Sequence, residues 1–191
     1  MKVIAFNGSP RILGNTHTAL EFVLDELGKE GIETEIIQMG IESVDPCNAC
    51  QTCLQNTDGR CLIETDKVNE WFDEARESDG IIIGSPVYFG GMTAQTKAFV
   101  DRMGKLAKAN GDAFKRKVGA AVTVHRRAGA LNAFNEINLF FLIGQMIVVG
   151  SDYWNVAVGL DRGDVIEDEE AERTLRRLGH NMAWLLRKLQ E

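Results

Sequence analysis

The sequence contains no apolar run long enough to cross a membrane and no surplus of basic charge. Spanning a bilayer takes about 20 apolar residues, whereas the opening apolar stretch, 3–6, stops at Asn7-Gly8 and is too short for a secretory signal. The formal net charge of -7 argues against a general nucleic-acid binder, which presents a basic face. We therefore expect a cytoplasmic protein with no membrane and no nucleic-acid partner.

Cysteine is missing from all but one short stretch. The spacing there is C-x2-C-x2-C-x7-C, and its four residues are Cys47, Cys50, Cys53 and Cys61. Disulfides between residues this close would form small, strained rings, whereas disulfide frameworks spread their cysteines across a fold. Thiolates at such intervals can instead converge on one inorganic centre, as in the ferredoxin run that holds an iron–sulfur cluster. The common zinc patterns, two separated C-x2-C pairs or a cysteine pair with a histidine pair, are absent.

Short apolar runs alternate with amphipathic stretches along the chain, which indicates an α/β fold with a parallel sheet. We predict strands over 3–6, 34–38, 81–83, 118–124 and 146–149. The spacing of apolar residues predicts helices over 16–28, 66–78, 93–107, 131–143 and 167–189. This pattern favours a flavodoxin-like doubly wound five-stranded sheet, as a single domain over 1–191 with a cysteine-rich loop at about 42–65.

The loop after the first predicted strand lacks both standard nucleotide-binding fingerprints. Residues 7–16 read Asn-Gly-Ser-Pro-Arg-Ile-Leu-Gly-Asn-Thr, which matches neither the P-loop nor G-x-G-x-x-G. Small and hydroxyl residues before a helix N-terminus still suit an anion. Ser9, Asn15 and Thr16 can donate to a phosphomonoester, and Arg11 adds positive charge. The alternative is a plain turn in which Asn15 or Thr16 caps the helix.

Two further loops follow predicted strands at the carboxyl edge of the sheet, where ligands of such folds bind. Residues 85–93 read Ser-Pro-Val-Tyr-Phe-Gly-Gly-Met-Thr, and this aromatic, glycine-rich loop suits a planar ring better than a packed turn. Residues 125–127, His-Arg-Arg, follow the fourth strand and could close over that ring or meet a nicotinamide cofactor. His125 is read equally well as a surface residue.

Taken together, these motifs resemble those of a known family. Asn-Gly-Ser-Pro-Arg…Gly-Asn-Thr (7–16), the cysteine motif after Pro46, Ser-Pro-Val-Tyr-Phe-Gly (85–90) and Lys97…Asp101-Arg102 are similar to the NADPH-dependent FMN reductase superfamily. Within that superfamily the chain most resembles the iron–sulfur flavoproteins of anaerobic prokaryotes. The resemblance covers nearly the whole chain.

The resemblance implies an FMN-dependent oxidoreductase with a [4Fe–4S] cluster, assembled as a homodimer or homotetramer. It implies that the FMN phosphate is held by Ser9, Arg11, Asn15 and Thr16. It places the isoalloxazine ring against Pro86, Val87, Tyr88, Phe89 and Gly90. The implied cluster ligands are Cys47, Cys50, Cys53 and Cys61.

Three functions remain open on the sequence alone. The first is electron transfer by FMN and a cluster, with ferredoxin or NAD(P)H as the donor. The second is a cluster-free NAD(P)H-dependent reductase of flavins or quinones, in which Arg126 and Arg127 contact a cofactor phosphate. The third is a non-catalytic adaptor clamped by zinc, because a fold alone does not define a function.

Overall fold

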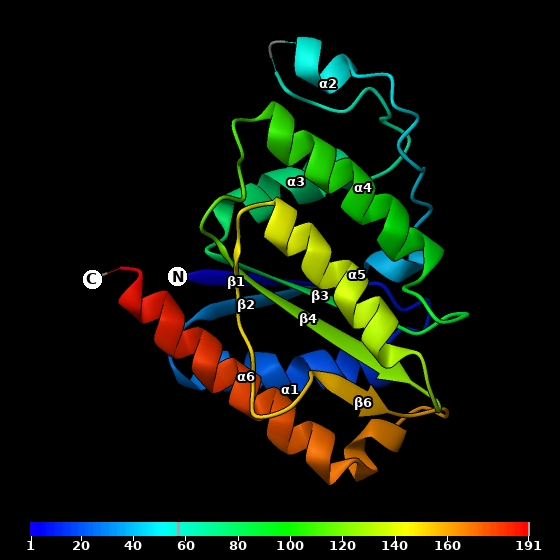
Figure 1. Cartoon of the computed structure of the whole chain (residues 1–191), viewed down its shortest axis with the longest axis vertical. Helices are drawn as coiled ribbons and strands as arrows, with labels where there is room; N and C mark the ends of the chain where they lie inside the picture. The colour runs from blue at the N-terminus through cyan, green and yellow to red at the C-terminus, as the bar shows by residue number, and fades with distance from the viewer. Residues whose placement is uncertain (57, 191) are drawn as a thin grey trace.

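The predicted parallel α/β sheet is present in the computed structural model, which describes residues 1–56 and 58–190. Position 57 of the predicted cysteine-rich loop and position 191 lie outside the described residues. The main strands stand in the order β2-β1-β3-β4-β5, with all pairs parallel (Figure 1). Their bounds are β1 Lys2–Asn7, β2 Glu33–Ile37, β3 Gly80–Pro86, β4 Val118–His125 and β5 Ile147–Val148. This order confirms the flavodoxin-like prediction.

Helices cover both faces of the sheet, as the connections between parallel strands require. In Figure 1, α1 and α6 lie on one side and α3, α4 and α5 on the other. Their bounds are α1 Asn15–Lys29, α3 Val68–Glu77, α4 Ala94–Ala109, α5 Ala130–Ile143 and α6 Glu169–Lys188. Shorter pieces are η1 Met39–Ile41, α2 Thr52–Gln55 and η2 Asp164–Glu167. The five predicted helices are therefore confirmed, and these short turns are additional.

The hydrophobic core has two parts, one on each face of the sheet, and side chains along each strand alternate between them. Val3 and Ala5 of β1 face the core under α1 and α6, whereas Ile4 and Phe6 face the core under α3, α4 and α5. Successive strand side chains point to opposite faces, so a strand buried on both sides needs apolar residues throughout. The run Ile81-Ile82-Ile83 follows this rule, because its members are divided between the two cores.

The fifth position of the sheet differs from the prediction. A single strand over 146–149 was expected, but β5 is only two residues long and pairs with the start of β4. A sixth strand, β6 (Val156–Val158), pairs with the end of β4 through Thr123, Val124 and His125. The chain leaves the sheet between these two strands and returns to it. Three residues are too few to produce a periodic pattern, which is why the sequence did not indicate β6.

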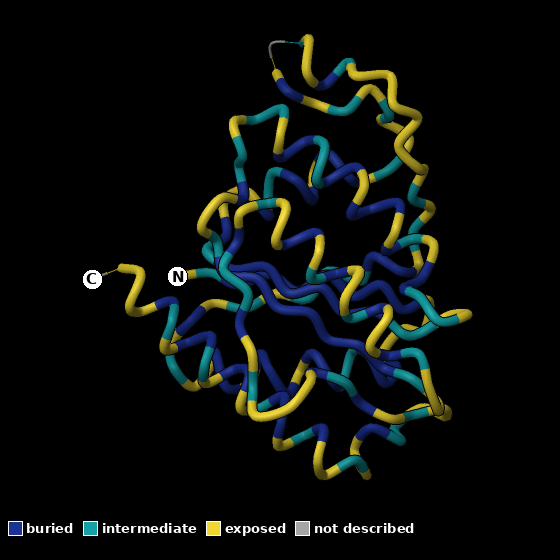
Figure 2. Tube along the Cα trace, in the orientation of Figure 1, coloured by how far each residue is buried: buried dark blue, intermediate teal, exposed yellow. Residues whose placement is uncertain are grey.

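The centre of the protein is buried, whereas many of its loops are exposed (Figure 2). The strands are dark, buried tubes, whereas the cysteine segment beyond α4 is mostly exposed (Figures 1 and 2). Across residues 1–56 and 58–190, none of the helices combines the length and the apolar character that crossing a bilayer demands. The sheet therefore serves as a scaffold on which the loops described below are placed.

Candidate functional site

Hydrogen bonds from three parts of the chain fix the loop that follows β1. Asn7 Oδ1 accepts from the Ser9 N–H (3.0 Å), and Asn7 Nδ2 donates to Gln38 Oε1 (2.8 Å). Gln38 Nε2 in turn donates to the Ser9 carbonyl oxygen (2.6 Å). The Thr93 hydroxyl donates to the Gly8 carbonyl oxygen (2.9 Å), which ties this loop to the loop after β3. These hydrogen bonds therefore tie the loop to Gln38 and to the loop after β3.

The start of α1 is left open toward this loop. Its N-cap is Gly14, without a capping side chain, and no acidic residue lies in the first turn. The alternative in which Asn15 or Thr16 caps the helix is therefore wrong. A helix start leaves backbone N–H groups unpaired and carries a partial positive charge, so an uncapped start is suited to an anion.

Asn15 instead connects the loop to a distant segment. Its Nδ2 donates to the Asp161 carbonyl oxygen (2.7 Å), and its Oδ1 accepts from the Gly163 N–H (2.9 Å). Arg11 Nη1 donates to the Leu160 carbonyl oxygen (2.7 Å), and Arg162 Nε donates to the Leu13 carbonyl oxygen (2.8 Å). Segment 159–163, which follows β6, thus closes one side of the site.

A cavity of about 130 Å³ opens where these loops meet. Arg126, in the loop after β4, and Gly159, directly after β6, also line this cavity. The predicted residues on its wall are Ser9, Arg11, Asn15, Thr16, Pro86, Val87 and Tyr88. An adjoining hollow of about 410 Å³ shares Arg126, Gly159 and Leu160 with it. The structure therefore brings seven of the nine predicted flavin-site residues together at the carboxyl edge of the sheet.

The remaining two predicted residues form the tip of a tight turn. Tyr88 and Gly91 exchange two backbone hydrogen bonds, of 2.9 and 3.1 Å. Phe89 and Gly90 lie between them at φ +49° and +86°, the left-handed region that bulky residues rarely adopt. Phe89 is fully exposed and, like Gly90, does not line the cavity. Backbone strain of this kind gathers at functional sites, because the surrounding structure must hold it in place.

The lining of this cavity is positively charged, whereas the chain as a whole carries a net negative charge. Among its described lining residues are the cations Arg11 and Arg126 but no carboxylate, although the protein carries a net charge of -7. The exposed Arg127 and the half-buried His125 do not line it. His125 Nδ1 is buried and finds no hydrogen-bond partner within residues 1–56 and 58–190. The site is suited to an anionic ligand beside an aromatic ring.

The sequence reading missed two contributors to this site, Gln38 and segment 159–163, whereas Arg126 was expected at this edge of the sheet and lies on the wall. The only sequence signal for the segment is its turn composition, Gly-Leu-Asp-Arg-Gly. Its role depends on contacts with residues nearly 150 positions earlier in the chain. Such contacts are invisible to local pattern analysis.

A second cavity, on the far side of α4, collects the four cysteines. Arg102, Lys105 and Leu106 of α4 form its floor. The cysteine segment supplies the rest of the wall through Cys47, Asn48, Cys50, Gln51, Cys53, Cys61, Leu62 and Ile63. All four thiols are free, with Cys47 and Cys50 exposed and Cys53 buried. The two cavities have no lining residue in common.

The backbone turns sharply between the cysteines. Ala49 and Gln51 adopt φ values of +58° and +61°, so both residues flanking Cys50 are left-handed. Hydrogen bonds from the Thr52 hydroxyl and backbone N–H lower the pKa of the Cys50 thiol. Burial raises the pKa of Cys53, with Cys61 adding to the rise and Lys105 opposing it. The exposed thiol is therefore the more readily ionised of the two.

Buried polar contacts fasten the cysteine segment to the domain. Arg102 is ion-paired with Asp66, and both side chains are almost completely buried. Arg102 Nη2 also donates to the Ile63 carbonyl oxygen (2.9 Å). Asn69 accepts from the Cys61 N–H (2.9 Å) and donates to the Cys61 carbonyl oxygen (3.0 Å). Within residues 1–56 and 58–190, no three His, Cys, Asp or Glu side chains converge closely enough to hold a single metal ion.

Comparison with known proteins identifies the family. Residues 1–161 match the NADPH-dependent FMN reductase family. An iron–sulfur flavoprotein from Methanocaldococcus jannaschii is 39% identical over 198 residues, covering 100% of both chains. An iron–sulfur flavoprotein from Methanosarcina thermophila is 36% identical over 154 residues, covering 80% of this chain and 78% of the relative.

Solved structures agree on the fold. An NAD(P)H:acceptor oxidoreductase flavoenzyme from Paracoccus denitrificans matches with a TM-score of 0.69 at 18% identity, covering 98% of this chain and 97% of that one. An archaeal flavodoxin matches with a TM-score of 0.65 at 19% identity, covering 98% and 99%. At such low identities the likeness establishes the flavodoxin-like fold alone, whereas the sequence matches reach further. The chain therefore belongs to the NADPH-dependent FMN reductase family of flavoprotein oxidoreductases.

Proposed function

We propose that this protein is an electron-transfer flavoprotein that holds FMN at the carboxyl edge of its sheet and a [4Fe–4S] cluster in its cysteine cavity. The observation that carries the proposal is that four free thiols line one cavity, which is separate from the flavin site. Relatives named iron–sulfur flavoproteins, one of them aligned over the full chain, support it. The reducing cytoplasm is the compartment in which such thiols persist.

The residues at the first cavity fit a phosphorylated flavin. The open start of α1 and the hydroxyls of Ser9 and Thr16 would hold the phosphate, with Arg11 balancing its charge. Val87 and Tyr88 would flank the ring. A cavity of about 130 Å³ is too small to enclose the whole molecule, so part of it would extend into the adjoining hollow. When bound, FMN supplies the electron storage that no side chain provides.

The residue types at the second cavity suit a cluster. A [4Fe–4S] cluster takes one cysteine thiolate at each iron. Four free thiols line this cavity, which is the number of ligands that such a cluster needs. When bound, such a cluster supplies one-electron exchange. The cationic side chains of Arg102 and Lys105 face a centre that carries negative charge.

The electron donor is proposed from the exposure of the two sites. Cys47 and Cys50 lie at the surface, so a small electron-transfer protein such as ferredoxin can approach the cluster directly. Arg126, exposed at the flavin cavity, is placed to meet a phosphate of NAD(P)H instead. We propose ferredoxin as the donor and NAD(P)H as the alternative.

Anaerobic purification with a visible spectrum and assays for iron and acid-labile sulfide tests the proposal. We expect one flavin per chain together with iron and sulfide in equal amounts. Flavin without iron or sulfide, bleached rapidly by NADPH, would instead support the cluster-free reductase. A colourless protein with one bound zinc would support the adaptor.

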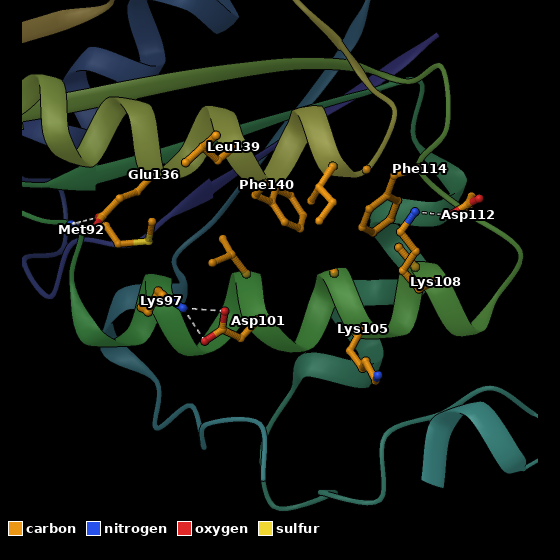
Figure 3. A pocket seen from close by; sticks show the side chains of 15 residues that line it. Met92, Lys97, Asp101, Lys105, Lys108, Asp112, Phe114, Glu136, Leu139 and Phe140 are labelled. Carbon is orange, nitrogen blue, oxygen red and sulfur yellow. Dashed lines mark hydrogen bonds and ion pairs between the residues drawn. The ribbon is translucent and has the colours of Figure 1, made fainter. Parts of the chain in front are cut away.

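The outer face of α4 and α5 supports the proposed self-association. A groove of about 510 Å³ runs between these helices, and Phe140 and Phe114 lie between them in Figure 3. Leu139, Leu142 and Ile143 of α5 are exposed beside it. An exposed apolar surface of this kind marks an interaction site.

A second copy of this chain fits the groove because the face is self-complementary. α5 presents exposed apolar side chains, and the groove beside them is lined by Gly104 of α4, which lies against the Phe140 ring. Lys97 and Asp101 lie at one end of this face, and Lys108 and Asp112 at the other, so two antiparallel copies would place unlike charges opposite each other. Two-fold pairing uses the same patch on both subunits. We therefore propose a homodimer through this face, which can pair again into a homotetramer.

Replacing Leu139 by aspartate should convert the dimer into monomers, because two buried carboxylates would face each other across the pair. Sedimentation velocity of the holoprotein measures this change directly. Trp184→Asp is the matched control, since Trp184 is equally exposed but lies on α6, on the opposite side of the sheet. A wild-type protein that stays monomeric at every concentration would contradict the proposal.

A further inference from the structure

Arg102 retains an unused hydrogen-bond donor at the cysteine cavity. Its Nη1 is ion-paired with Asp66, and its Nη2 donates to the Ile63 carbonyl oxygen. The third donor, Nε, is buried and finds no partner within residues 1–56 and 58–190. The Arg102 side chain is only 1% exposed. A buried donor left without a partner costs about 1–3 kcal/mol, and Arg102 is one of the residues that line the cysteine cavity.

Lys105 brings to the same wall a cation that, unlike Arg102, has no carboxylate partner among the described residues. It lies three residues after Arg102, on the same face of α4. The other lysines shown along this helix are paired: Lys97 contacts Asp101 and Lys108 contacts Asp112, each at 2.6 Å. Among the described residues, Lys105 has no such carboxylate. Lys105 lines both the cysteine cavity and the α4–α5 groove, and in Figure 3 the end of its side chain points toward the side on which α2 lies.

We propose that Arg102 and Lys105 form a cationic wall that stabilises the reduced state of the cluster and raises its reduction potential. This inference rests on the proposed function. Reduction adds one electron, and therefore one negative charge, to a centre bounded by four thiolates. Hydrogen bonds to sulfur and the net charge around a cluster set its potential. The Arg102 Nε–H has no partner in the described chain and would donate to a sulfur atom of the cluster, and the Lys105 ammonium would offset the added charge.

Lys105 is the residue to change, because Arg102 also holds the fold together. Removing one partner of a buried ion pair costs about 3–5 kcal/mol, so an Arg102 variant would release the cysteine segment. Lys105 is half-buried and makes no ion pair among the described residues, so Lys105→Gln removes the charge alone. Lys108→Gln is the control, since it removes a lysine charge from the same helix at a residue that does not line the cysteine cavity.

The experiment is an anaerobic spectroelectrochemical titration of the holoprotein, following the cluster and flavin bands separately. We expect Lys105→Gln to lower the equilibrium constant for one-electron reduction of the cluster about tenfold. This corresponds to a reduction potential that is lower by about 59 mV. Lys108→Gln should leave the cluster potential almost unchanged, and neither variant should shift the flavin. The difference should shrink at high salt, because an incompletely buried charge is screened.

A loaded cluster whose potential is the same in Lys105→Gln as in the wild type would overturn the inference. So would equal shifts in the two lysine variants. A wild-type protein that lacks iron and sulfide would instead overturn the proposed function, and the iron assay separates these cases. For Arg102, protein labelled with ¹⁵N-arginine should show nitrogen hyperfine coupling to the reduced cluster. No coupling would remove Arg102 from the wall.

Discussion

Replacing Cys50 by serine should remove iron and acid-labile sulfide from the protein while leaving its flavin in place. Cys50 is exposed, and Thr52 lowers its pKa, so its thiolate is available as a ligand. A serine hydroxyl stays protonated and bonds iron poorly. The flavin cavity and the cysteine cavity share no lining residue, so the loss should not spread between them.

The measurement is the iron, sulfide and flavin content of anaerobically purified protein. We expect iron and sulfide near zero and flavin at the wild-type level. Leu62→Ala is the control, because Leu62 lines the same cavity, is exposed and carries no ligand atom. Loss of the flavin along with the iron would contradict the separation of the two sites.

Gly40→Ala should weaken FMN binding and destabilise the fold together. Gly40 lies in η1, directly against the loop after β1. An added Cβ would overlap the Ser9 carbonyl oxygen and the backbone carbons of Gly8 and Ser9. These are backbone atoms, so no side chain can rotate away to relieve the clash. The loop that would hold the phosphate must move instead.

Overpacking of this kind costs about 1–3 kcal/mol in free energy of unfolding. We expect FMN affinity to fall at least about tenfold, or about 1.4 kcal/mol. Flavin fluorescence titration of the apoprotein and denaturant unfolding measure the two effects. Gly28→Ala is the control: Gly28 lies on α1 with nothing within 4 Å of an added Cβ. That variant should gain up to about 1 kcal/mol of stability. Unchanged FMN affinity in Gly40→Ala would show that the loop does not depend on this contact.

The fold could be predicted from the sequence because burial leaves a local signature. The three consecutive isoleucines at 81–83 read as a strand buried on both faces, and the structure divides them between two cores. The helices on either side of the sheet were visible in the same way, through apolar residues at helical spacing. The order of the strands follows from the α/β alternation and its usual topology.

The site could be predicted only where its residues stand close together in the chain. The loops after β1 and β3 were recognisable as units, and the structure brings seven of their predicted residues to one cavity. Asn15 shows the limit. Its residue type predicted a phosphate donor or a helix cap. The structure adds hydrogen bonds from its amide to segment 159–163, which no local pattern could predict. Likewise, no local pattern distinguishes Lys105 from its paired neighbours.

The interruption of the sheet between β5 and β6 also bears on solubility at high concentration. An outer strand normally offers a row of free backbone groups on which another molecule's strand can add and start a fibre. Here that border consists of pieces of only two and three residues. No uninterrupted ladder is therefore available on this side, and the protein is guarded against strand-to-strand aggregation along it.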